Sequence, residues 1–204
     1  MAKGSLQGMF PDMPKEEPKG RLTPLGYDLG EVTSAMIKEL RLGNEEEAAW
    51  WAMELSEVAP YYVWKRLLLF ASEDVGVGDP EAVEQLVALA MAWFLAASYQ
   101  RNPHLDPEHL INAVMVLCRA TKNTDADDLK NLVYNRRMAA KKNPTQKLEI
   151  PDYALDAHTK RGKAMGRGNA HWYSLRDTFL EGKGPYHQKL EQEFPGFVGK
   201  EVTQ

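Results

Sequence analysis

Four acidic side chains lie close together in the stretch SEDVGVGDPE, namely Glu73, Asp74, Asp79 and Glu81. Carboxylates at short spacing bind hard cations and perform acid–base catalysis. Calcium loops, however, place such oxygens at alternate positions, as in D-x-D-x-D-G, and this stretch does not. Asp79 precedes Pro80, the arrangement of an N-cap before the first helical residue, while adjacent Glu73 and Asp74 diverge at a helix end. The sequence therefore predicts a turn between two helices, without a metal.

Histidines are the next candidates for metal or phosphate chemistry. They are His104, His109, His158, His171 and His187. None has the spacing H-x-x-x-H or H-E-x-x-H, and the single cysteine, Cys118, cannot complete a zinc site. The sequence also has no G-x-S-x-G or P-loop motif, so we expect a non-enzymatic protein without a cofactor. One enzymatic alternative remains, in which His158 and His171 act with Asp152 or Asp156.

A basic segment, KRGKAMGRGNAHWY, follows near the C-terminal end. Its cationic side chains are Lys160, Arg161, Lys163 and Arg167. With glycines between them, they are predicted to contact phosphates of DNA, and Trp172 and Tyr173 could stack on an exposed base. Residues 130–167 carry ten basic and three acidic side chains, a local charge of +7 in a chain of net charge −4. The alternative is a solvated turn with both aromatic rings in the core.

Trp50 and Trp51 are neighbours in the stretch EEEAAWWAMELSEV. Consecutive residues on a helix point about 100° apart, so one core cannot easily hold both rings. We therefore predict that one of the two tryptophans contributes to a protein interface.

Composition places the chain among globular proteins, because 204 residues with 44% hydrophobic side chains can bury a core. Residues 1–26 begin with a Pro-, Gly-, Lys- and Glu-rich stretch and predict a disordered arm. We expect residues 27–204 to form a single domain, with a helical core at 27–142 and a loop-rich basic tail at 143–204. The sequence shows no secretory signal and no run of about 20 uncharged apolar residues, so we expect a cytoplasmic protein with no membrane association. A buried Cys118 is consistent with a reducing compartment.

Helix signals recur along the chain and strand-like alternation does not, so we predict an all-α, bundle-like fold of about six to eight helices. The first helix places four apolar side chains on one face, Val32, Met36, Ile37 and Leu40, and ends at Gly43.

Later helices are predicted from their starts. These are Asn44, Pro60, Asp79–Pro80, Asp106–Pro107 and Thr124. Thr124 and Asp127 resemble a capping box, in which each side chain binds the other's backbone N–H. In the tail we expect helices from Tyr153, near residues 174–180 and near residues 187–193.

Three blocks of sequence resemble a known family. SAMIKELRLGNEEEAAWWAMELSE, YVWKRLLLFASEDVGVGDPEA and INAVMVLCRATKNT are similar to the C-terminal region of the MgsA/RarA group of AAA+ ATPases, which includes the Werner-helicase-interacting protein. The family motif R-R-L-x-x-x-A-S-E-D-x-G-x-A-D-P is represented here by Ser72, Glu73, Asp74, Gly76, Asp79 and Pro80. The resemblance covers roughly residues 27–165. It implies that the acidic stretch is a structural turn of a helical oligomerisation domain.

In the full-length relatives this region follows the ATPase core and assembles a tetramer that acts at stalled replication forks. The resemblance thus implies a homo-oligomer, expected to be a tetramer, linked to DNA replication, recombination or repair. Possible partners are a separate AAA+ ATPase, single-strand-binding protein and DNA. No Walker A lysine precedes residue 27, and the tail resembles stand-alone copies of the module, so an ATP-dependent step is expected to need another chain. The alternative is a small DNA-binding protein that uses residues 130–167.

Overall fold

The computed structural model describes residues 22–102, 107–168, 171–172 and 185–194. Among them helices predominate, and the one β contact is an isolated bridge between Leu22 and Asp28, so the predicted all-α class is confirmed. The chain forms two compact units, Met1–Arg136 and Arg137–Gln204. The predicted arm up to residue 21 and the helix expected near residues 174–180 lie outside the described residues.

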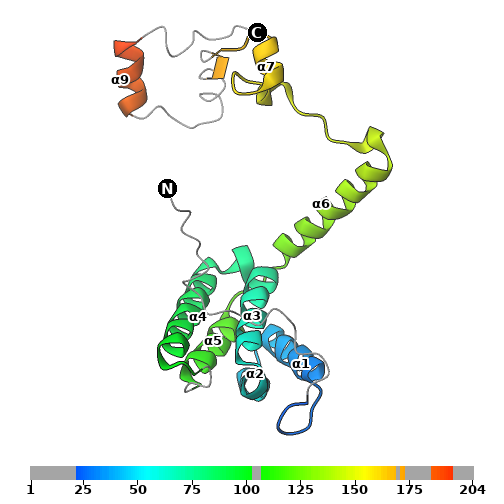
Figure 1. Cartoon of the computed structure of the whole chain (residues 1–204), viewed down its shortest axis with the longest axis vertical. Coiled ribbons are helices and arrows are strands. Elements are labelled where there is room, and N and C mark those ends of the chain that lie inside the picture. Colours follow the sequence, from blue (N-terminus) through cyan, green and yellow to red (C-terminus); the bar gives the residue numbers. More distant parts are fainter. Residues whose placement is uncertain (1–21, 103–106, 169–170, 173–184, 195–204) are drawn as a thin grey trace. The chain divides into compact units, whose positions relative to one another are not determined.

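The described part of the first unit is a bundle of helices joined by short turns (Figure 1). Its elements are α1 (Leu29–Leu42), α2 (Glu45–Val58), α3 (Pro60–Phe70), a π turn (Ala71–Val75), a 3₁₀ turn (Gly76–Gly78), α4 (Pro80–Gln100) and α5 (Glu108–Arg119). Helix α2 packs against α1, α3 and α5, and α4 packs against α5 and the π turn. Helix α6 (Asp125–Lys142) follows and contains the division between the two units.

The core of the first unit lies between these helices. All four apolar side chains predicted for the first helical face, Val32, Met36, Ile37 and Leu40, are buried. Aromatic rings fill the space between α3 and α4, where the ring centroids of Trp64 and Trp93 are 5.6 Å apart.

Two predicted helix starts are correct in their mechanism. Asp79 caps α4, because its Oδ1 accepts a hydrogen bond from the N–H of Ala82 at 3.1 Å, and Pro60 is the first residue of α3. Such caps satisfy backbone groups that a helix end leaves without partners.

Two other predicted caps are wrong. The Asn44 side chain makes no cap hydrogen bond to α2 and instead donates to Glu39 Oε2 at 2.7 Å. At the start of α6, the Thr124 hydroxyl donates to Asp128, while Asp127 accepts from Lys130 and Asn131, so no capping box forms. In both places a neighbouring carboxylate orients the side chain that would have capped the backbone by accepting a hydrogen bond from it.

After α6, the described residues of the second unit form short elements. They are 3₁₀ turns at Pro144–Gln146 and Asp152–Ala154, α7 (Lys160–Ala164) and α9 (Pro185–Glu193). A continuous helix from Tyr153 was predicted and does not form. The Asp156 carboxylate accepts the N–H of His158 at 2.9 Å, which bends the chain, and Thr159 then caps α7 through a hydrogen bond from Gly162 N. The helix expected at residues 187–193 is present as α9.

Candidate functional site

The acidic turn, defined as residues 71–80, joins α3 to α4. Its two adjacent acids separate as predicted, with Glu73 exposed and Asp74 only 5% exposed. Asp74 receives two hydrogen bonds from Arg41 on α1, with Nε 2.6 Å from Oδ1 and Nη2 3.1 Å from Oδ2. This hydrogen bonding raises the pKa of Arg41. Two parallel bonds of this kind fix both side chains in position.

The acidic turn also holds the segment that follows α5. The backbone oxygen of Asp74 accepts the N–H of Asn123 at 2.8 Å, and Asp79 Oδ2 accepts the N–H of Thr121 at 3.3 Å. A Cβ on Gly78 would lie 2.6 Å from the Cβ of Asn123, so glycine is required for this close approach. Gly76 has a φ of 47°, a backbone conformation that favours glycine. The turn therefore connects α1, α3, α4 and the start of α6.

Lys122 holds the same segment after α5 by binding the last carbonyl groups of that helix. Its Nζ donates to the carbonyl oxygens of Leu117, Cys118 and Ala120 at 2.7 to 3.1 Å, at the C-terminal end of α5. Burial lowers the pKa of Lys122 and raises the pKa of the neighbouring Cys118 thiol to about 11. Cys118 is thus buried and a weak nucleophile.

The tryptophan pair is divided between core and surface. Trp51 packs against the core and meets Tyr27 edge to face, with ring centroids 5.5 Å apart. Trp50 is 56% exposed, and Met53 one turn later is also exposed. We call Trp50 and Met53 the α2 patch. Of the two predicted interface residues, Trp50 is the one that another protein can reach.

The basic turn, residues 156–168, holds the four predicted phosphate-contact residues in two different ways. Lys160, Arg161 and Lys163 are exposed on α7. Arg167 is 16% exposed at its side chain and donates to Asp152 Oδ2 and to the backbone oxygens of Asp152 and Leu155. Arg167 thus closes the turn, which leaves the other three side chains directed at solvent.

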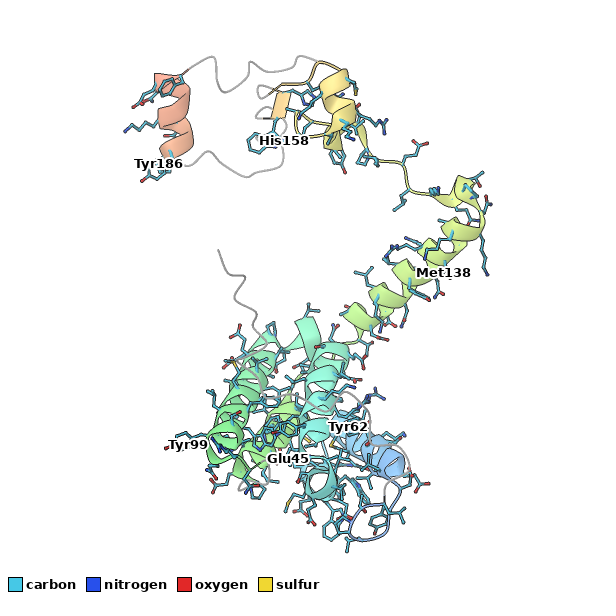
Figure 2. All side chains as sticks on the ribbon, viewed as in Figure 1. Glu45, Tyr62, Tyr99, Met138, His158 and Tyr186 are labelled. Carbon is cyan, nitrogen blue, oxygen red and sulfur yellow. The ribbon has the colours of Figure 1, made fainter. Side chains whose placement is uncertain are left out.

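The histidine alternative depends on the same turn, where His158 is labelled in Figure 2. His158 Nδ1 lies 3.1 Å from Asp156 Oδ2, and hydrogen bonds from His158 lower the pKa of Asp156. The His158 ring also meets Trp172 edge to face. Asp152 is paired with Arg167, so each carboxylate of the proposed site has a structural partner. No group of three or more His, Cys, Asp or Glu side chains suited to a metal occurs in the described parts of the chain.

Sequence reasoning missed Arg41 and the outer face of α4. Arg41 lies 33 positions before its partner Asp74, and nothing local links the two. The signal for α4 was present, since residues 85–100 contain no charged side chain. By length and composition α4 could even cross a membrane, although its inner face belongs to the core, with Leu86 and Trp93 buried.

Comparison with known proteins identifies the chain at the level of the family. A family model described as the C-terminal region of the MgsA AAA+ ATPase matches residues 43–182. The chain belongs to this family. The match includes the acidic turn, the α2 patch and the basic turn, and it confirms the resemblance inferred from the sequence.

Individual proteins are also similar in sequence to this chain. The Haemophilus influenzae replication-associated recombination protein A is 31% identical over 199 residues, which cover 91% of this chain and 41% of the relative. The Escherichia coli K12 protein of the same name is 31% identical over 153 residues, covering 72% of this chain and 31% of the relative. An uncharacterized AAA domain-containing protein of Mycobacterium tuberculosis is 29% identical over 150 residues. The chain spans less than half the length of these MgsA-family relatives.

Proposed function

We propose that this chain is a self-associating, non-enzymatic module that takes part in replication-associated recombination. The observation that carries the proposal is the match of residues 43–182 to the MgsA C-terminal family, together with relatives named for replication-associated recombination. The carboxylates of Asp74 and Asp79 already hold parts of the bundle together, which supports a structural rather than a catalytic role for the acidic turn. We propose a tetramer as the assembled state.

The α2 patch supplies one surface for such assembly. An exposed tryptophan with an exposed methionine one turn away is the kind of anchor that dominates protein interfaces. Both side chains are presented by a helix whose other face is fixed in the core, since Ala52 and Leu55 are fully buried. A partner can therefore bind Trp50 without rearrangement of the bundle.

The two tryptophans provide a matched test of this surface. Trp50→Ser should reduce the mass of the assembled protein and leave each chain folded, because Trp50 contributes little to the core. Trp51→Ser should lower the thermal midpoint, because it removes contacts with the core and with Tyr27. Light scattering and thermal unfolding measure the two effects. Val77→Ser, at an exposed apolar site in the acidic turn, is the control, and an unchanged mass for Trp50→Ser would refute the α2 interface.

A separate AAA+ ATPase of the same family, single-strand-binding protein and DNA are the partners we propose for the assembled module. Self-association would raise the affinity for a repeated partner such as DNA, because several weak contacts act together.

Direct DNA binding is the second candidate function, favoured by the exposure of Lys160, Arg161 and Lys163 on one short helix. Reversal of these three charges should weaken binding to forked DNA, and each lost phosphate contact should reduce the logarithmic salt slope by about 0.7–0.9. Reversal of Lys38, an exposed lysine on α1, is the control. Equal binding by both variants would exclude the basic turn as the DNA site.

A further inference from the structure

The outer face of α4 is an apolar surface that no other described helix covers. It is formed by Val87, Ala88, Met91, Ala92, Leu95 and Tyr99, all exposed. Met91 is 50% exposed and Leu95 65% exposed, while Tyr99 projects away from the bundle (Figure 2). Contiguous apolar surface of this kind marks an interaction site in soluble proteins.

The spacing along this face fits another helix. Glu84, Ala88, Met91 and Leu95 follow one another at intervals of four, three and four residues, which is the seam spacing of paired helices. Alanines at 88 and 92 leave room for a second backbone to approach between the larger side chains. The face therefore has the pattern of a helix–helix contact.

The charges at the two ends identify the partner. Glu81 and Glu84 lie at the N-terminal end of α4, Arg101 caps its C-terminal end, and Met91 lies midway between Glu81 and Arg101. In an antiparallel pair of identical helices, each Arg101 would lie beside the glutamates of the other copy, and the helix dipoles would oppose one another favourably. A parallel pair would place like charges together at each end.

Arg101 has a second unusual property. Its φ is 53°, and it is the one non-glycine residue with positive φ among the described residues. Glycine adopts this helix-ending conformation at lower cost, so a side chain retained here is expected to be used. An ion pair between Arg101 and the glutamates of a second copy would explain why an arginine occupies this position.

We infer that α4 pairs antiparallel with α4 of a second copy of this chain, through the seam centred on Met91. This inference rests on the proposed self-association and assigns it a second surface. A closed tetramer with two-fold symmetry requires two different self-complementary contacts, and the α2 patch and the α4 face are on separate helices. Each contact alone would hold two chains together.

Light scattering on the full chain tests the inference. Met91→Glu places two carboxylates at the centre of the pair, so the mass should fall from four chains to two, and to one when combined with Trp50→Ser. Val77→Glu is the control, because it introduces the same charge at an exposed apolar site elsewhere. An unmodified chain that is monomeric would refute the proposed self-association itself. An oligomer unaffected by Met91→Glu would refute only the α4 pairing.

A charge exchange tests the antiparallel arrangement. Arg101→Glu alone, and Glu81→Arg combined with Glu84→Arg, should each weaken the α4 dimer about 3- to 10-fold, and the triple variant should restore it, because each end then meets its complement again. Failure of the triple variant to restore association would overturn the antiparallel pairing. Sedimentation with phosphatidylglycerol vesicles tests the alternative that the apolar face of α4 binds a lipid membrane. Vesicle binding by the unmodified chain that Met91→Glu abolishes would assign the face to a membrane and overturn the inference.

Discussion

At the residue scale, the Asp74 carboxylate is buried and its charge is balanced by the Arg41 guanidinium, 2.6 Å away. Loss of Arg41 would leave a buried charge without its partner, and such groups destabilise a fold strongly. Because the Arg41 side chain is itself half exposed, water would replace part of the interaction.

We therefore predict that Arg41→Ala lowers the free energy of unfolding by about 1–3 kcal/mol, measured by urea denaturation. Arg119→Ala is the matched control, since Arg119 makes an equally short pair with Glu45 at the surface. Removal of that exposed pair should lower the free energy of unfolding much less, because water and salt screen it. Equal losses in the two variants would contradict a special role for the pair in the acidic turn.

The same residues show how far local sequence reasoning reaches. Asp79 before Pro80 identified a helix cap because all the groups involved lie within four positions. Adjacent Glu73 and Asp74 were expected to diverge, but their partners were not predictable, because Arg41 is brought close only by the packing of α1. The contacts of Arg167 with Asp152 and Leu155 were not predictable either, since a guanidinium can satisfy several backbone oxygens of a loop whose course the sequence does not reveal.

At the scale of the elements, α6 differs from the helices before it. It contains 18 residues and buries none of them, whereas α5 buries five of its side chains. Its acidic first turn and basic last turn suit the helix dipole, and Lys130 pairs with Asp127 three positions earlier. Isolated helices of this length are only marginally stable in water, so α6 depends on these weak local contacts.

Hydrogen exchange of backbone amides should therefore be faster in α6 than in the helices of the bundle. We predict that backbone amides of α6 exchange at least about tenfold faster than those of α5, because opening α6 exposes no core surface. Mass spectrometry of peptides from residues 126–142 and 110–119 provides the comparison. Equal protection in the two helices would show that α6 is covered in solution, contrary to its exposed state in the structure.

Helix positions were predictable to within a few residues because their signals are local, as with Gly43 at the end of α1 and Pro60 at the start of α3. The outer face of α4 was not recognised, because an uncharged stretch of 16 residues is equally consistent with a helix buried on all sides. Only the packing of Leu86 and Trp93 into the core shows that the opposite face is left uncovered.

At the scale of the whole molecule, the carboxylates of the acidic turn are used internally, while α2 and α4 each present exposed apolar side chains beside a face that is packed in the core. Residues 130–167 carry a charge of +7, while the rest of the chain carries about −11. This separation suits a module that associates through apolar helix faces and meets an anionic partner through a different part of its surface.

The central claim is self-association, and the mass of the unmodified chain in solution tests it most directly. We would measure light scattering over a wide range of protein concentrations, at physiological salt and without DNA. One chain has a mass of 23.0 kDa, so the tetramer that we propose corresponds to roughly 92 kDa, four times that value, and should persist on dilution. A mass of 23.0 kDa at every concentration would contradict the claim.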